Sequence, residues 1–215
     1  MIEAVVFDLD GVIVDSEQVW DAVREEYARE TDATYTDRAT RDMMGMSSVE
    51  WSRYMADELG VPGTPEEINA EIVARMLARY GEEPPLIDGA VEAVQLAATR
   101  WPLAIASSSN PELIEVVLRA AGLRDLFPVT VSSQEVARGK PAPDVYLEAA
   151  DRLGVDSGSC AAVEDSHNGI RSAKAAGMRV VAVPNSHFPP DDEALALADA
   201  VAPSVSALTL ELLAG

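Results

Sequence analysis

Five short apolar runs, separated by segments of helical pattern, constrain the fold of this chain more than any other feature. The first run, 4–7, contains β-branched residues and leads into the polar sequence 8–11. Short apolar strands that alternate with helices favour a parallel sheet with right-handed crossovers. The pattern therefore predicts an α/β fold with a Rossmann-like three-layer core. Polar, glycine or proline residues also follow the other four runs, 103–106, 129–131, 160–163 and 179–183.

The alternation stops after the first run, where the sequence predicts three or four helices and no strand. One helix is expected over about 16–30 and another over about 48–59. A third begins at a capping box formed by Thr64 and Glu67 and ends at Gly81. This interruption indicates a second unit inserted into the first. We expect a Rossmann-like catalytic core over 1–15 and 86–215 and an inserted all-helical cap over 16–85.

The charge balance of the chain limits its expected partners. Of the 215 residues, 37 are acidic and 16 are basic, which gives a formal net charge of −21. Such a surface repels polyphosphate backbones and anionic lipid, so we expect neither a nucleic acid partner nor a membrane partner. Cys160 is the single cysteine, so no intramolecular disulfide can form, and a cytoplasmic location is expected. The residues predict no particular oligomeric state.

Polar side chains gather where four of the predicted strands end. The carboxyl ends of parallel strands meet at one edge of a sheet, where folds of this kind bind their ligands. Four carboxylates placed together there would repel one another unless they shared a cation, and oxygen ligands select a hard ion such as Mg²⁺. A substrate phosphate would give the lysine and the hydroxyls a common target. The residues are Asp8 and Asp10 after the first run, Ser107 and Ser108 after the second, Lys140 after the third, and Glu164 and Asp165 after the fourth.

Each of these motifs also has a structural explanation when taken alone. A DxDG sequence occurs in turns and in calcium loops, although Val12 and Ile13 lack the oxygen ligand and the glycine that a calcium loop requires. The serines are consistent with a polar loop in which a capping box from Ser109 to Glu112 begins the next helix. The coincidence of all four motifs at strand ends, in this order, favours a ligand site.

Four motifs give the chain a family resemblance that covers nearly its whole length. With them the chain resembles the haloacid dehalogenase-like superfamily, specifically the phosphatase and β-phosphoglucomutase-like group with a helical cap after the first motif. The resemblance implies phosphoryl-transfer chemistry on a small phosphorylated metabolite. The motifs are 7–12 (FDLDGV), 105–109 (IASSS), 139–144 (GKPAPD) and 163–170 (VEDSHNGI).

The resemblance also implies a role for each residue in the reaction. Asp8 would attack the substrate phosphorus and form an aspartyl-phosphate. Asp10 would protonate the leaving oxygen and then deprotonate the water that hydrolyses the intermediate. Lys140 would hold the nucleophile and neutralise the transferring oxygens, and Ser107, next to Ser108, would donate a hydrogen bond to the phosphate.

A Mg²⁺ cofactor follows from the same resemblance. Its implied ligands are the Asp8 carboxylate, the Asp10 carbonyl oxygen and Asp165, while Glu164 supports the site directly or through water. The second acid at position 10 also argues against dehalogenation, because a halide leaving group needs no proton.

Residues of the predicted cap distinguish between the candidate functions that share an aspartyl-phosphate intermediate. In β-phosphoglucomutases a histidine stands where this chain has Trp20 and an arginine where it has Ser48, and the cap of this chain contains no lysine. A bisphosphate intermediate would be poorly held without these cations. The sequence therefore favours a phosphatase for a sugar or polyol phosphate, with a phosphomutase as the alternative.

Two further alternatives are less consistent with the residues. A phosphonatase-type reaction needs a cap lysine for a Schiff base. A non-catalytic binding protein on the same scaffold would not need the complete catalytic set. The expected substrate contacts in the cap, on position alone, are Glu17, Trp20 and the loop 43–48.

Overall fold

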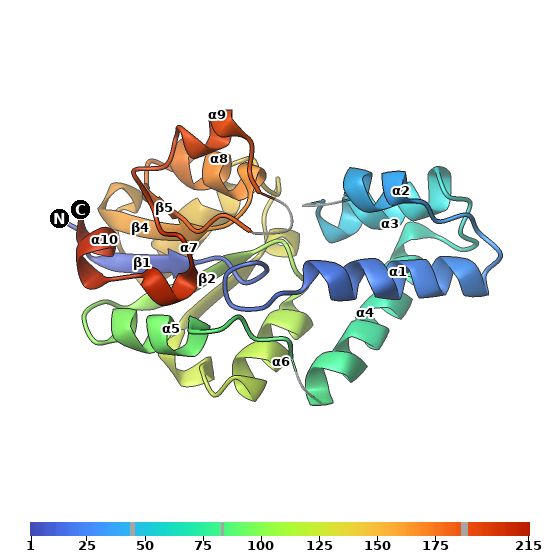
Figure 1. Ribbon diagram of the computed structural model, residues 1–215, viewed down its shortest axis with the longest axis horizontal. Helices are drawn as coiled ribbons and strands as arrows, with labels where there is room; N and C mark the ends of the chain where they lie inside the picture. Colours follow the sequence, from blue (N-terminus) through green and yellow to red (C-terminus); the bar gives the residue numbers. More distant parts are fainter. Residues whose placement is uncertain (44–45, 83, 186–188) are drawn as a thin grey trace.

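The core of the protein is a parallel sheet of six strands in the order β3-β2-β1-β4-β5-β6 (Figure 1). The α/β fold class is confirmed, and the short strand β6 is an addition that the sequence pattern did not predict. The computed structural model describes residues 1–43, 46–82, 84–185 and 189–215. The strands are β1 (Ala4–Phe7), β2 (Leu103–Ser107), β3 (Val129–Ser132), β4 (Cys160–Glu164), β5 (Arg179–Ala182) and β6 (Ala200–Val201).

Strand β1 lies at the centre of the sheet, where the strand order reverses. Phe7 pairs in register with Ile105 of β2 on one side and with Val163 of β4 on the other. The residues that follow Phe7 therefore emerge between the carboxyl ends of β2 and β4. A reversal point of this kind is the usual ligand position in an open parallel sheet.

Helices cover both faces of the sheet because alternate strand residues point in opposite directions. Val5 and Phe7 belong to one apolar cluster, and Ala4 and Val6 belong to the other. Figure 1 shows α5 and α6 below the sheet and α8 and α9 above it. The first cluster includes residues of α5 (Ala90–Ala98), α6 (Pro111–Ala120) and α10 (Leu210–Ala214), and the second those of α7 (Asp144–Leu153), α8 (His167–Ala175) and α9 (Asp192–Leu195).

An all-helical cap is inserted after β1 and lies beside the sheet in Figure 1. No strand occurs among its described residues. The predicted capping box begins the last cap helix, where Thr64 N–H donates to Glu67 and Glu67 N–H donates to Thr64 Oγ1. The helices are α1 (Glu17–Glu30), α2 (Asp37–Met43), α3 (Ser48–Asp57) and α4 (Pro65–Glu82); short 3₁₀ turns η1 (Arg124–Leu126), η2 (Ser133–Glu135), η3 (Ser157–Ser159) and η4 (Val205–Ala207) belong to the core.

The two chain segments that join the cap to the core lie side by side. The N–H of Asp15 donates to the carbonyl of Pro85 at 2.8 Å, and the N–H of Ile87 donates to the carbonyl of Ile13 at 3.0 Å. Both crossings therefore occur at one place, which supports the proposed division into a core over 1–15 and 86–215 and a cap over 16–85. None of the described helices is long and apolar enough to cross a lipid bilayer.

Candidate active site

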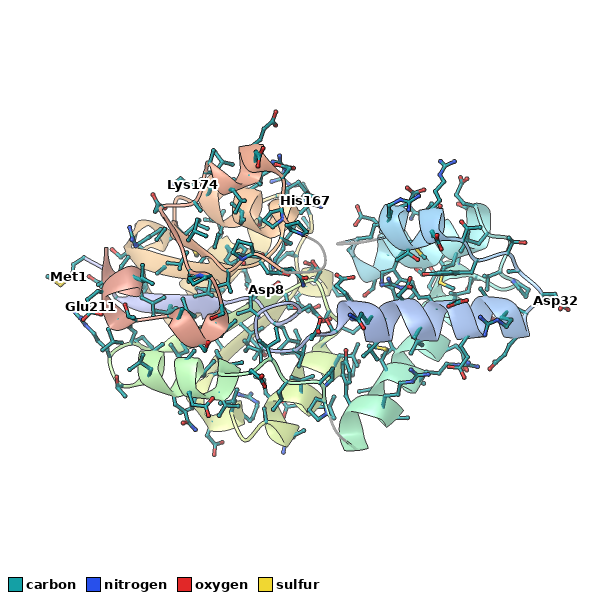
Figure 2. The ribbon with its side chains drawn as sticks, viewed as in Figure 1. Met1, Asp8, Asp32, His167, Lys174 and Glu211 are labelled. Carbon is teal, nitrogen blue, oxygen red and sulfur yellow. The ribbon has the colours of Figure 1, made fainter. Side chains whose placement is uncertain are left out.

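A pocket opens at the carboxyl edge of the sheet, where the core meets the cap. Figure 2 shows Asp8 at the end of β1 that faces the cap helices. The core supplies acidic, hydroxyl and lysine side chains to this pocket, and the cap supplies an acid, an arginine and aromatic rings. Its lining includes Asp8, Asp10, Ser108, Ser109, Lys140 and Asp165 from the core and Glu17, Trp20, Arg24, Met46, Ser48 and Trp51 from the cap.

Lys140 is the centre of a buried ion cluster at the bottom of the pocket. Its Nζ lies 2.9 Å from Asp8 Oδ1 and donates to Glu164 Oε1 at 2.6 Å. Burial alone would lower the pKa of the lysine, but the Asp8 and Glu164 carboxylates outweigh burial and raise it. Lys140 therefore stays charged beside the two acids. One lysine cannot neutralise the four carboxylates of the site.

The Glu164 carboxylate is fully buried and is fixed by hydrogen bonds to both oxygens. Oε1 accepts from Lys140 and, at 2.9 Å, from the Tyr146 hydroxyl. Oε2 accepts from the N–H groups of Asp165 and Ser166 and from the Ser166 hydroxyl. These five bonds leave little capacity for a metal ion, so the arrangement favours a positioning role for Glu164, through Lys140.

Two glycines, Gly11 and Gly169, leave the space that the Asp165 and Glu164 carboxylates occupy. Gly11 has a φ of +80°, and a Cβ there would lie 1.8 Å from Asp165 Oδ2. A Cβ on Gly169 would lie 1.7 Å from Glu164 Oε1. Both distances are far below a van der Waals contact, so each acid occupies space that only glycine leaves free.

Asp10 accepts hydrogen bonds from the core and from the start of the cap. The hydroxyls of Ser107 and Ser109 donate to Oδ2 at 3.2 and 2.7 Å. The Ser16 hydroxyl and the Trp20 indole N–H donate to Oδ1 at 2.5 and 3.4 Å. Asp10 thus connects β1, β2 and α1 at the entrance to the cap.

The hydrogen bonds of the serine loop differ from the predicted capping box. Asn110, rather than Ser109, is the N-cap residue of α6, and its side chain makes no capping bond to that helix. The Ser109 hydroxyl binds Asp10 instead. The expected capping role of Ser109 is therefore wrong, because a short hydrogen bond to a carboxylate competes with a helix cap.

The acidic side chains of the pocket fit a divalent cation. One carboxylate oxygen from each of Asp8, Glu164 and Asp165 lies within 4.8 Å of the others, and all three residues are buried. Burial, opposed by Lys140 and reinforced by Glu164 and Asp10, raises the pKa of Asp8 to about 8. Burial and the neighbouring carboxylates also raise the pKa of Asp165 well above its usual value. A bound cation would relieve both effects, and oxygen donors suit a hard ion.

The predicted site residues of the core meet at this edge of the sheet. Ser108 lines the pocket, whereas Ser107 is fully buried and its hydroxyl is directed to Asp10. A hydrogen bond from Ser107 to a phosphate therefore stays a prediction.

The cap residues expected to contact substrate also reach the pocket. Glu17 and Trp20 line it, and the Trp20 ring packs against Trp51 with centroids 5.8 Å apart. Of the loop 43–48, Met46 and Ser48 line the pocket, while positions 44 and 45 lie outside the described residues.

Arg24 brings a positive charge from the cap to the pocket. The absence of lysine from the cap and the residues at positions 20 and 48 did not predict this arginine, which is one helical turn beyond Trp20 on α1. Tyr146 and Asn185 were also missed; the Asn185 amide donates to Asp165 at 3.4 Å. The helical spacing from Trp20 to Arg24 was the one available signal, since residues four apart share a helix face.

A capped parallel sheet that carries buried acids and a lysine at its reversal point defines a class of phosphoryl-transfer hydrolases. The family model of the haloacid dehalogenase-like hydrolases matches residues 2–177. The chain belongs to this family, and the resemblance stated from its motifs is confirmed.

Relatives of known name cover the chain over almost its whole length. Hexitol phosphatase B of Escherichia coli (strain K12) is 34% identical over 231 aligned residues, which cover 99% of this chain and 96% of that protein. The crystal structure of CbbY from Rhodobacter sphaeroides in complex with phosphate superposes with a TM-score of 0.87, at 28% identity and 99% coverage of both chains. The β-phosphoglucomutase of Clostridium difficile has a TM-score of 0.82 at 22% identity, which shows a common fold alone.

Proposed function

We propose that this protein is a Mg²⁺-dependent phosphatase that hydrolyses a small phosphorylated metabolite, a sugar or polyol phosphate, through an aspartyl-phosphate on Asp8. The observation that carries this proposal is the position of Asp8, which lies at the end of the central strand, in the pocket and 2.9 Å from Lys140. Family membership and the phosphatase name of a relative covering the whole chain support it.

The reaction would proceed in two steps that use two carboxylates. In the first, an oxygen of Asp8 bonds to phosphorus, the ester P–O bond breaks, and Asp10 gives a proton to the leaving oxygen. In the second, Asp10 removes a proton from water, whose oxygen bonds to phosphorus as the aspartyl P–O bond breaks. Inorganic phosphate leaves, and Asp8 is restored. Because positions 8 and 10 lie on the same side of an extended chain, both acids can face one phosphoryl group.

Lys140 and Glu164 would act on this reaction without exchanging protons. The Lys140 ammonium stabilises negative charge on the transferring oxygens and holds Asp8. Glu164 fixes the ammonium through the 2.6 Å hydrogen bond. Ser108 and Ser109 line the pocket next to the start of α6, where backbone N–H groups favour an anion.

Asp8 and Asp165 are the residues best placed to hold Mg²⁺, with the Asp10 carbonyl as the third proposed ligand. When bound, the ion supplies charge neutralisation at the phosphoryl oxygens. The protein's contribution is to keep both acids buried and close together.

The substrate class rests on the relatives and on the lining of the cap. Hexitol phosphatase B is named for a polyol phosphate. Here Glu17 gives the pocket a polar contact suited to hydroxyl groups, and Trp20 gives it an apolar wall. The single, buried cysteine, Cys160, is consistent with the proposed cytoplasmic location.

Phosphate release from a panel of phosphorylated metabolites tests this proposal. The panel contains sugar, polyol and nucleoside monophosphates together with p-nitrophenyl phosphate, each assayed before and after EDTA treatment. We expect release from sugar or polyol phosphates, loss of release after chelation, and recovery with Mg²⁺. Ca²⁺ should inhibit, because its looser shell would misplace the nucleophile. Full activity in EDTA would refute the metal dependence.

A further inference from the structure

Arg24 is a buried cation in the cap that forms no salt bridge with any described acidic residue. It is 6% exposed and lines the same pocket as Asp8 and Lys140. Its guanidinium carbon lies 5.0 Å from the ring centroids of both Trp20 and Trp51. Among the described residues it forms neither an ion pair nor a hydrogen bond, and its buried Nε has no partner.

Among the described residues, Arg24 is the one buried arginine. Arginines such as Arg75, which pairs with Glu30 and Glu71, reach carboxylates readily where the chain folds for stability alone. Burial lowers the pKa of Arg24, and the charge of Glu17 only partly offsets this. A buried guanidinium without a partner destabilises the protein, so a benefit elsewhere is required to explain its position.

The two indole rings determine which groups of Arg24 remain able to bind a ligand. They hold the guanidinium in the angle between two tilted planes, whose centroids are 5.8 Å apart with an interplanar angle of 52°. Cation–π contact stabilises the charge but uses none of the N–H donors. A guanidinium held in this way keeps its donors for a planar or tetrahedral anion, which it can bind in a bidentate manner.

We propose that Arg24 binds a second anionic group of the substrate, a carboxylate or a phosphate, remote from the phosphoryl group that Asp8 attacks. This inference rests on the proposed phosphatase function and narrows its substrate class. Lys140 already pairs with Asp8 and Glu164, so of the described basic side chains in the pocket Arg24 is the one without an acidic partner. A substrate that extends from the core into the cap would bring its second anion to this arginine.

Two matched pairs of substrates test the inference and separate the two anions. 6-Phosphogluconate and sorbitol 6-phosphate differ in a carboxylate against a hydroxymethyl group at the far end of one carbon chain. Fructose 1,6-bisphosphate and fructose 6-phosphate differ in a second phosphate. We expect kcat/KM to be about tenfold or more higher for the anionic member of at least one pair, mainly through KM, since hydrogen bonds between charged groups are stronger than those between neutral groups.

Variants of Arg24 assign that preference to the residue. Arg24→Met removes the charge at similar length and should bring the ratio of kcat/KM within the preferred pair close to 1. Arg24→Lys keeps the charge but not the bidentate geometry, and should keep part of the ratio. Arg53→Met, at an exposed position of α3, is the matched control and should keep the wild-type ratio. Cooperative thermal unfolding checks that each variant is folded.

The outcomes distinguish a failure of the inference from a failure of the proposed function. Asp8-dependent turnover of p-nitrophenyl phosphate by the wild type, with no anion preference in either pair, would overturn the role of Arg24 and leave the phosphatase proposal standing. A preference that survives in folded Arg24→Met would also overturn it. No phosphate release from any of these compounds would overturn the proposed function itself.

Discussion

At the scale of residues, the polar side chains of the site are linked by shared ion pairs and hydrogen bonds. Lys140 bridges Asp8 and Glu164, and Tyr146 donates to the same Glu164 oxygen as the lysine. Removing one member of such a cluster leaves its partners as buried, unpaired groups. A substitution here can lower the rate of phosphate release, the melting temperature or both. Which of them falls should depend on whether the substitution removes a charge or adds atoms where space is already occupied.

Asp8→Asn separates the chemistry from the fold. The amide keeps the shape of the side chain and removes the nucleophile, so phosphate release should fall by about 10³-fold or more. The melting temperature should not fall, because the change relieves repulsion among buried carboxylates. Asp88→Asn, which makes the same change at an exposed position, is the control. Substantial turnover by purified, folded Asp8→Asn would show that another group begins the reaction.

Gly169→Ala tests the position of Glu164. The added methyl group would overlap the carboxylate, so Glu164 must move and Lys140 loses its 2.6 Å partner. We expect a loss of roughly tenfold or more in kcat together with a lower melting temperature, since misplaced catalytic groups reduce rate steeply. Gly81→Ala, where nothing lies within 4 Å of the new Cβ, should keep the wild-type kcat and should not lower the melting temperature, because alanine favours the helix more than glycine does. Unchanged kcat in Gly169→Ala would mean that the position of Glu164 has no effect on the reaction.

At the scale of elements, one carboxylate links the last strands of the core to α8. Asp199 accepts a hydrogen bond from the Val180 N–H at 2.8 Å and pairs with Lys174 of α8 at 2.9 Å. It therefore ties α8, β5 and the chain before β6 together. Burial opposes ionisation of Asp199, but the lysine and the N–H outweigh it and hold the pKa of this carboxyl below its usual value of 3.8.

This lowered pKa gives a pH-dependent contribution to stability with a definite sign. A carboxyl whose pKa is lower in the folded state stabilises the protein above its unfolded pKa, and the contribution is lost as pH falls through the folded value. Asp199→Asn should therefore lower the melting temperature at pH 7, and the difference from wild type should shrink below pH 3.8. Thermal melts across that range provide the measurement. A difference that stays constant with pH would show that charge is not the cause.

At the scale of the whole molecule, the cap and the sheet share one apolar core. The cluster that contains Phe7 of the central strand also contains Trp20 and Trp51 of the cap. The Ser48 hydroxyl of α3 further donates to Asn110 at the start of α6, at 2.6 Å. These contacts hold the cap against the site. The residues of the cap should therefore determine whether a phosphorylated Asp8 is hydrolysed or transfers its phosphate to another hydroxyl.

The cap composition predicts hydrolysis rather than phosphomutase action. A mutase must hold a bisphosphate while it reorients. The positions of Trp20 and Ser48 offer it no charge, and Arg24 is the one basic side chain that the described cap residues bring to the pocket. Incubation with β-glucose 1-phosphate and a trace of the 1,6-bisphosphate should therefore yield inorganic phosphate or no reaction. Chromatographic separation of the products is the measurement. Accumulation of glucose 6-phosphate without phosphate release would mean that Arg24 suffices to retain the intermediate.

Much of the architecture follows from local patterns that the sequence contains in full. The strands end where apolar runs meet polar residues, and the cap helix α4 begins at its predicted capping box. The Asp8 and Asp10 positions at the carboxyl end of β1 follow from the strand alone. These features depend on residues within a few positions of one another, which is why periodicity and motif spacing predict them.

The tertiary structure decided how the polar groups are shared. Ser109 binds Asp10 instead of capping its helix, and Lys140 and Tyr146 bind Glu164, because residues distant in sequence meet at the same acceptors. The Arg24 guanidinium lies against both Trp20 of α1 and Trp51 of α3, a packing contact between elements that local spacing does not specify. The sequence by itself determined the sheet, the inserted helices and the acids at the strand ends; long-range packing in a medium of low polarity determined which of their charges are paired.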